Sequence, residues 1–260
     1  MTSDEHMNDH AALFAQWQRI ISAVEALQPE DWASPTRLGD WSVKELVAHL
    51  AGNPWWLTRC ASELTNAKAK VDAQSYFDTY DAGDVDRTAK NRAEESSPDY
   101  LIGMLRATTA EAIELIATMD PAQVICGGDA PITFADMTFT RVVEAVVHGL
   151  DLAAATGSFE QEPAALKVVA RWCAQRLERT HKGRTIEVRI PPVAAVQIAG
   201  PQGDGPRHKR GTPPNTVETD PTTWIELATG RVTWSEAVAA HRVSASGRLA
   251  DLDWALPVLA

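Results

Sequence analysis

The stretch from Arg141 to Leu152, RVVEAVVHGLDL, carries the residues best suited to chemistry. Its four ionisable residues are spaced three, four and three positions apart: Arg141, Glu144, His148 and Asp151. On an α-helix this spacing places them on one face, while valine, leucine and alanine occupy the other faces. A helix that is apolar on nearly all sides is usually buried, so its ionisable residues need partners inside the protein. A metal ion and a buried salt-bridge network both meet that need.

A further histidine lies in a second predicted helix. Ser42 and Glu45 form a capping box, S-x-x-E, at the head of an apolar run that carries His49. A lone histidine in such a helix is more often a core residue than a ligand, and the capping box accounts for Glu45. If the two helices face each other, the side chains of His49, Glu144 and His148 would form a three-ligand set that is typical of a catalytic zinc with an open position.

Hydrophobic residues at helical spacing predict four helices in the first part of the chain, over residues 11–27, 42–64, 97–119 and 134–155. Pro54 is expected to kink or restart the second of them. The polar segment 68–95 is expected to form a solvated loop and a charged helix start, and Cys126–Gly128 a tight turn. This pattern predicts a four-helix bundle, in which metal and cofactor sites form from side chains on facing helices.

The pattern changes after a further predicted helix over residues 163–180. Alternating apolar and polar residues predict strands over 185–190, 193–198, 216–219 and 242–246. Helices are expected over 220–228, 233–240 and 249–259. We therefore predict two domains, a helical bundle over residues 1–180 and a small α+β domain over residues 181–260.

Composition narrows the class of protein. The net charge of −11 predicts a surface that repels nucleic acid and anionic membranes, so neither is an expected partner. No apolar run approaches the length of a membrane-spanning helix, and the polar N-terminus is unlike a secretory signal. Cys60, Cys126 and Cys173 are widely spaced, and each is expected to be a small buried hydrophobe. We expect a cytoplasmic protein.

Two motifs resemble a known family. GDWSVKELVAHLAG and RVVEAVVHGLDLAAATG look like the N-terminal domain of the mycothiol-dependent maleylpyruvate isomerase family, a relative of the DinB-like bundles. DPTTWIELATGRVTWSEAVAAHRVSASGRLADL is similar to the sterol-carrier-like domain that follows it in these proteins. The resemblance implies that His49, Glu144 and His148 bind a divalent metal, commonly zinc. It also implies a mycothiol-like thiol as cofactor and an arginine of the second domain near the substrate, for which Arg231 is our first candidate and Arg210 the second.

The leading hypothesis is a metal-dependent enzyme that uses a low-molecular-weight thiol to isomerise a small electrophilic substrate or to transfer the thiol to it. Arg231 and Asp151 are its expected catalytic residues; Asp151 would orient a ligand or the amine of the thiol cofactor. A salt bridge from Asp151 to Arg141 or to a neighbouring helix is the alternative. The competing functions are a non-enzymatic small-molecule or lipid-binding protein of sterol-carrier type and an interaction module with a buried ion-pair stripe.

Overall fold

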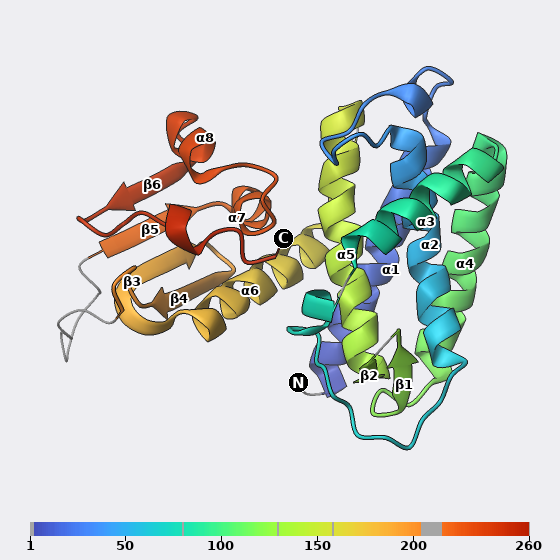
Figure 1. The fold of residues 1–260 in the computed structure, drawn as a ribbon, viewed down its shortest axis with the longest axis horizontal. Coiled ribbons are helices and arrows are strands. Elements are labelled where there is room, and N and C mark those ends of the chain that lie inside the picture. The colour runs from blue at the N-terminus through green and yellow to red at the C-terminus, as the bar shows by residue number, and fades with distance from the viewer. Residues whose placement is uncertain (1–2, 80, 129, 158, 204–214, 260) are drawn as a thin grey trace. The chain divides into compact units, whose positions relative to one another are not determined.

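The computed structural model describes residues 3–79, 81–128, 130–157, 159–203 and 215–259. The chain divides into two compact units, Met1–Ala165 and Leu166–Ala260. The first unit is mostly helical, and the second combines helices with a four-stranded sheet (Figure 1). Both features agree with the fold class that the sequence predicts.

Four long helices make up most of the first unit: α1 (Ser3–Glu25), α2 (Val43–Ala61), α4 (Pro98–Thr118) and α5 (Phe134–Thr156). Helices α1 and α2 each contact both α4 and α5. Their inward faces are apolar; Leu46 and Val146 are fully buried. Burial of each such side chain stabilises the fold by roughly 1.5–3 kcal/mol, so this packing holds α2 and α5 against each other.

Local signals set the ends of these helices. Glu45 accepts a hydrogen bond of 2.7 Å from the backbone N–H of Ser42, which confirms the predicted capping box at the start of α2. Ser97 caps α4, and Gly157 ends α5 in the left-handed conformation, with φ of 70°. Pro54 does not restart α2: the helix continues through Pro54 to Ala61. The Pro54 side chain itself is buried.

Helix α3 (Ala82–Glu95) occupies the second part of segment 68–95, for which the sequence predicts a solvated loop and only a charged helix start. Its sequence is so polar that only Ala89 and Ala93, one turn apart, are buried, and such a narrow apolar face gives a weak periodic signal. The Asp81 side chain caps it by accepting from two backbone N–H groups. Short 3₁₀ helices precede it at Asp31–Ala33 and Tyr76–Thr79.

A small hairpin joins α4 to α5. Strands β1 (Val124–Gly127) and β2 (Ala130–Thr133) pair in antiparallel fashion, with Gly127 opposite Ala130. Gly128 adopts a positive φ of 73° at the turn, where glycine avoids the clash of a Cβ. The predicted turn therefore lies inside a hairpin, whose four-residue strands are too short to stand out in the sequence.

Helix α6 (Pro163–Thr180) belongs mainly to the second unit, so the boundary at residue 165 comes earlier than the predicted one at residue 180. The side chain of Trp224 donates to the carbonyl of Ala170 at 3.1 Å, and that of Arg176 donates to the carbonyl of Val258 at 2.6 Å. These bonds tie α6 to the segment 221–228 and to the end of the chain.

The sheet of the second unit has the strand order β4-β3-β5-β6. Its strands are β3 (Lys182–Ile190), β4 (Ala194–Ile198), β5 (Asn215–Thr219) and β6 (Val243–Ser246); β3 is parallel to β5, and the other pairs are antiparallel. Ile186, Val188 and Ile190 are fully buried, as their alternation predicts. Helices α7 (Pro221–Ala228) and α8 (Trp234–Ala239) follow β5. The expected helix over 249–259 is wrong: only Asp253–Ala255 is helical, because Pro257 stands in that segment.

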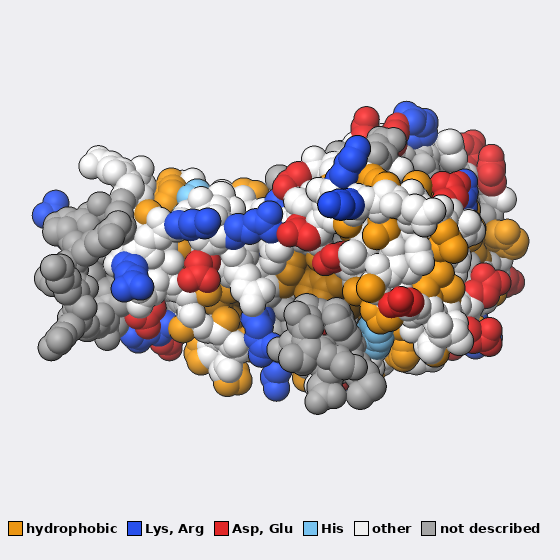
Figure 2. Space-filling view, turned by 90° about the horizontal axis from the view of Figure 1, so that it is seen from below, with side chains coloured by type: hydrophobic (Ala, Val, Ile, Leu, Met, Phe, Trp, Pro, Cys, Tyr) orange, Lys and Arg blue, Asp and Glu red, His pale blue; other side chains and the backbone are white. Residues whose placement is uncertain are grey.

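The surface of the helical unit carries acidic side chains. Figure 2 shows Asp and Glu side chains spread over the face that it displays, with hydrophobic side chains between them. Of the helices in the described ranges, none has the length and hydropathy needed to span a membrane.

Candidate metal centre

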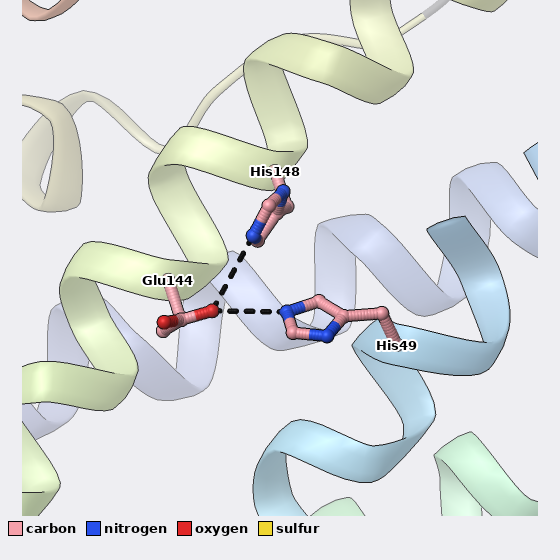
Figure 3. A group of neighbouring side chains, drawn as sticks. All are labelled: His49, Glu144 and His148. Carbon is pink, nitrogen blue, oxygen red and sulfur yellow. Dashed lines mark hydrogen bonds and ion pairs between the residues drawn. The ribbon is translucent and has the colours of Figure 1, made fainter. Parts of the chain in front are cut away.

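Helices α2 and α5 bring His49, Glu144 and His148 together (Figure 3). The Oε2 atom of Glu144 lies 3.0 Å from Nε2 of His49 and 3.4 Å from Nε2 of His148. One potential ligand atom from each residue falls within 4.8 Å of the others. Two imidazole nitrogens and a carboxylate oxygen are a donor set that suits a divalent cation such as Zn²⁺, with room for a further ligand.

The three side chains are withdrawn from solvent. The Glu144 side chain is 7% exposed, and those of His49 and His148 are 16% and 14% exposed. The two imidazole rings lie edge to face, with centroids 4.5 Å apart, and the Trp41 ring packs against His49. Because the packing limits ring rotation, the three donor atoms stay directed at one another.

Asp151 supports His148 from the opposite side. Its carboxylate lies 2.9 Å from Nδ1 of His148 and accepts a second hydrogen bond, at 2.7 Å, from Nε of Arg37. Asp151 is fully buried. A carboxylate at Nδ1 keeps the proton on that nitrogen and directs Nε2 toward the centre. Arg37 was missed by the sequence analysis, because an arginine in a turn-rich link gives no signal of a partner more than a hundred residues away.

Burial and mutual charge shift the pKa values of all three residues. Burial raises the pKa of Glu144, but hydrogen bonds from both histidines outweigh it and leave the pKa well below its usual value. Burial, together with the neighbouring His148, lowers the pKa of His49. Burial also lowers the pKa of His148, but its hydrogen bonds to Asp151 and Glu144 raise it to about 9. In the metal-free protein near neutral pH, the cluster therefore holds an ionised carboxylate, a neutral His49 and a protonated His148.

A cavity of about 440 Å³ opens beside His49. Helix α2 lines it with a stripe of residues at helical spacing: His49, Gly52, Asn53 and Trp56. The opposite walls include Tyr76, Arg92 of α3 and Arg141 of α5. Its volume is in the range of small-molecule sites. Asn53 and Arg92 were missed by the sequence analysis, although the spacing of Asn53 from His49 is the signal that could have found it.

Arg141 and Arg231 lie in different surroundings. Arg141 is 2% exposed, and its guanidinium contacts the Thr140 hydroxyl and the Tyr76 ring. Arg231 belongs to the second unit, where it follows α7 and donates to the carbonyl of Thr229 at 2.9 Å. Its catalytic role stays a prediction, and Arg210 lies outside the described residues.

The cysteines are separate from this cluster. Cys60 and Cys173 are buried, as predicted, whereas Cys126 is partly exposed; all three are free thiols. Burial raises the pKa of Cys60 to about 11 and that of Cys173 to about 12, so both stay protonated at neutral pH. A protonated thiol is a poor nucleophile, which leaves these two cysteines without an evident catalytic use.

Comparison with known proteins agrees with the two units. A family model described as the mycothiol maleylpyruvate isomerase N-terminal domain matches residues 13–153, and a model described as bacterial SCP ortholog matches residues 162–258. Two uncharacterized proteins of Mycobacterium tuberculosis, MT0041 and Rv0036c, are each 26% identical to this chain over 198 residues, which is 75% of this chain and 74% of the relative.

Solved structures share the fold. Crystal structures of a mycothiol-dependent maleylpyruvate isomerase and of its histidine-to-alanine mutant match 95% of this chain and 96% of theirs. The TM-score is 0.61 in both cases, at 14% sequence identity.

Proposed function

This chain belongs to the family of the mycothiol maleylpyruvate isomerase N-terminal domain, and we propose that it is an enzyme that uses a divalent metal and a low-molecular-weight thiol, such as mycothiol, on a small electrophilic substrate. The reaction is an isomerisation or a transfer of the thiol. The observation that carries this proposal is the convergence of His49, Glu144 and His148 at one buried point beside a cavity.

The three side chains would hold the metal, for which zinc is our first choice because of the donor set. When bound, the cation supplies the charge that deprotonates a coordinated thiol, and reversible addition of that thiol to an unsaturated carbon allows either isomerisation or transfer. Asp151 keeps the Nδ1 proton of His148 in place, so that Nε2 faces the centre. The lowered pKa of His49 leaves its lone pair available near neutral pH.

The cavity walls determine what can approach. Trp55, Trp56 and Tyr76 provide flat apolar surfaces that would exclude water and pack against an unsaturated substrate. The raised pKa values of Cys60 and Cys173 support a thiol that comes from a cofactor instead of the chain. Arg231 remains our candidate for an anionic group of the substrate, and a cytoplasmic location remains our expectation.

The direct test is turnover. Metal-loaded protein would be incubated with mycothiol and a set of unsaturated acids that includes maleate, and the products followed by NMR and mass spectrometry. We expect a product that requires both metal and thiol and disappears in His148→Ala. No thiol-dependent product from metal-loaded protein across the set would contradict the proposal.

One observation favours a second function, the match of residues 162–258 to the bacterial SCP ortholog model. In that case the second unit would bind an apolar molecule and the first would be a scaffold. A lipid that copurifies with the protein, together with unchanged binding in His148→Ala and no thiol-dependent turnover, would support it.

A further inference from the structure

Asn53 lies in the cavity wall with its polar group unsatisfied. It is 4% exposed, and its Oδ1 atom has no hydrogen-bond partner in the described part of the chain. Buried amides nearly always find partners, because an unmade hydrogen bond in the interior is costly. Because no hydrogen bond within the described residues fixes the amide oxygen, the amide can turn so that its NH₂ group faces the cavity and donates to an acceptor there.

Arg92 of α3 lines the same cavity from the wall that faces α2. Its Nη1 donates to the carbonyl of Ala48 at 2.9 Å, and within the described ranges it forms no ion pair with a carboxylate. Burial lowers its pKa, which indicates a guanidinium that has lost water without gaining an acidic partner. A guanidinium in this state is well suited to bind an anion, since its remaining N–H groups can make charge-assisted hydrogen bonds.

Gly52 makes room for this guanidinium. A Cβ at position 52 would lie 2.3 Å from Nη1 of Arg92, so any side chain there would displace the guanidinium from α2. The glycine thus lets Arg92 approach the helix backbone directly beside Asn53. A glycine in the middle of a helix lowers helix propensity, which is consistent with a role for it in seating Arg92.

The acidic residues of the cavity do not occupy Arg92. The Asp81 carboxylate caps α3 by accepting from the backbone N–H groups of Gly83 and Asp84. Asp84 in turn forms an ion pair with Arg87 on the exposed side of α3. Both carboxylates therefore have partners of their own, and the contacts of the Arg92 guanidinium in the described residues are the carbonyl of Ala48 and the Trp55 ring, whose centroid is 5.9 Å away; no carboxylate neutralises its charge.

We propose that Arg92 and Asn53 form a carboxylate-binding site in the cavity wall, and that this site holds an acid group of the electrophilic substrate. Asn53 follows His49 by one helical turn, so the carboxylate would lie roughly 6 Å along α2 from the metal centre. A small unsaturated acid bridges that distance and stacks on the aromatic wall. The assignment of the acid group to the substrate rests on the proposed function.

Binding of fumarate to the metal-loaded full chain tests the site without any thiol or turnover. We expect calorimetry to show a millimolar Kd for the wild type and weaker binding of the neutral dimethyl ester. Arg92→Gln should weaken fumarate binding by about tenfold or more and Asn53→Ala by about fivefold, since each removes a hydrogen bond to the carboxylate. Arg106→Gln is the matched control, because Arg106 is an exposed arginine on α4 that pairs with Glu25, and it should bind as the wild type does.

Gly52→Ala separates binding from folding. It keeps Arg92 and improves helix propensity, but displaces the flexible end of the arginine, so fumarate affinity should fall by about fivefold or more while helicity and metal content stay unchanged. Wild-type affinity for fumarate in both Arg92→Gln and Gly52→Ala would overturn the site. So would a wild type that fails to bind fumarate at all.

Once turnover is established, kinetics can test whether the bound carboxylate belongs to the electrophilic substrate or to the thiol cofactor. Arg92→Gln should raise the KM for the electrophilic acid and leave that for the thiol unchanged; a rise for the thiol alone would overturn the assignment to the substrate. The two proposals fail separately. If the variants lose fumarate binding but the wild type gives no thiol-dependent product, the site stands and the enzyme function fails. If the wild type gives that product but the variants bind fumarate as the wild type does, only the site fails.

Discussion

His148 Nδ1 lies 2.9 Å from the carboxylate of Asp151, which is fully buried and also accepts a hydrogen bond from Arg37. Both residues belong to α5, and each has its own part in the centre. Asp151 fixes the imidazole, and the imidazole presents Nε2 to Glu144 and His49. The sequence analysis gave Asp151 two alternatives, to orient a ligand or the amine of the thiol cofactor, or to form a salt bridge with Arg141 or a neighbouring helix. In the structure its carboxylate contacts His148 and Arg37, which lies in the link before α2, and its role in orienting a ligand stays a prediction.

Asp151→Asn should weaken metal binding by about 10–100-fold while the protein stays folded, because the amide cannot supply the negative charge that holds the Nδ1 proton and raises ligand basicity. Competition with a chromophoric chelator measures this affinity. Asp99→Asn, a change of the same kind at the exposed start of α4, is the control. Equal metal affinity in Asp151→Asn and the wild type would contradict the claim that Asp151 supports metal binding through His148.

Metal affinity should rise with pH. The pKa of His148 is raised to about 9 in the metal-free protein, so at pH 7 metal must displace a proton from it. Affinity should therefore increase by about tenfold per pH unit toward pH 9 and then level off. Calorimetry in buffers of different ionisation enthalpy should also detect the release of about one proton near pH 7. An affinity that is flat between pH 7 and 9 would contradict this reading of His148.

Cys60 and Cys173 should be dispensable for turnover. Cys60→Ala and Cys173→Ala should each destabilise the protein by about 1 kcal/mol, because each removes a buried sulfur, but leave thiol-dependent kcat unchanged. Urea denaturation and kinetic assays measure the two effects. A loss of turnover in either variant, with its fold and metal content intact, would indicate that the chain supplies the nucleophilic thiol.

Most of the helical framework could be predicted from sequence because its signals are local. Capping residues such as Ser42 and Ser97 mark helix starts, and hydrophobic periodicity marks the buried faces. Helix α3 was expected only as a charged helix start, because its buried face is narrow and made of small residues. The β1–β2 hairpin was expected only as a turn, because its strands have four residues each. The boundary between the units depends on long-range contacts of α6, which leave no mark in its own sequence.

The candidate centre was predictable in part. Glu144 and His148 are one turn apart on α5, so their proximity follows from spacing alone. The approach of His49 depends on the packing of α2 against α5, so the sequence could give it only on the condition that the two helices face each other. Arg37 contacts Asp151 from the link before α2, whereas Asn53 and Arg92 line the cavity from α2 and α3. Only the three-dimensional structure shows these placements.

Elemental analysis of the purified protein, expressed with zinc, manganese and iron in the medium, tests the central claim most directly. We predict about one divalent metal per chain in the wild type and in His10→Ala, whose histidine lies on α1 and outside the cluster. His49→Ala and His148→Ala should fold, as judged by circular dichroism, and retain less than about a tenth of that metal. A folded wild type that carries no metal, or a metal content unchanged in both histidine variants, would contradict the claim that these residues form a metal centre.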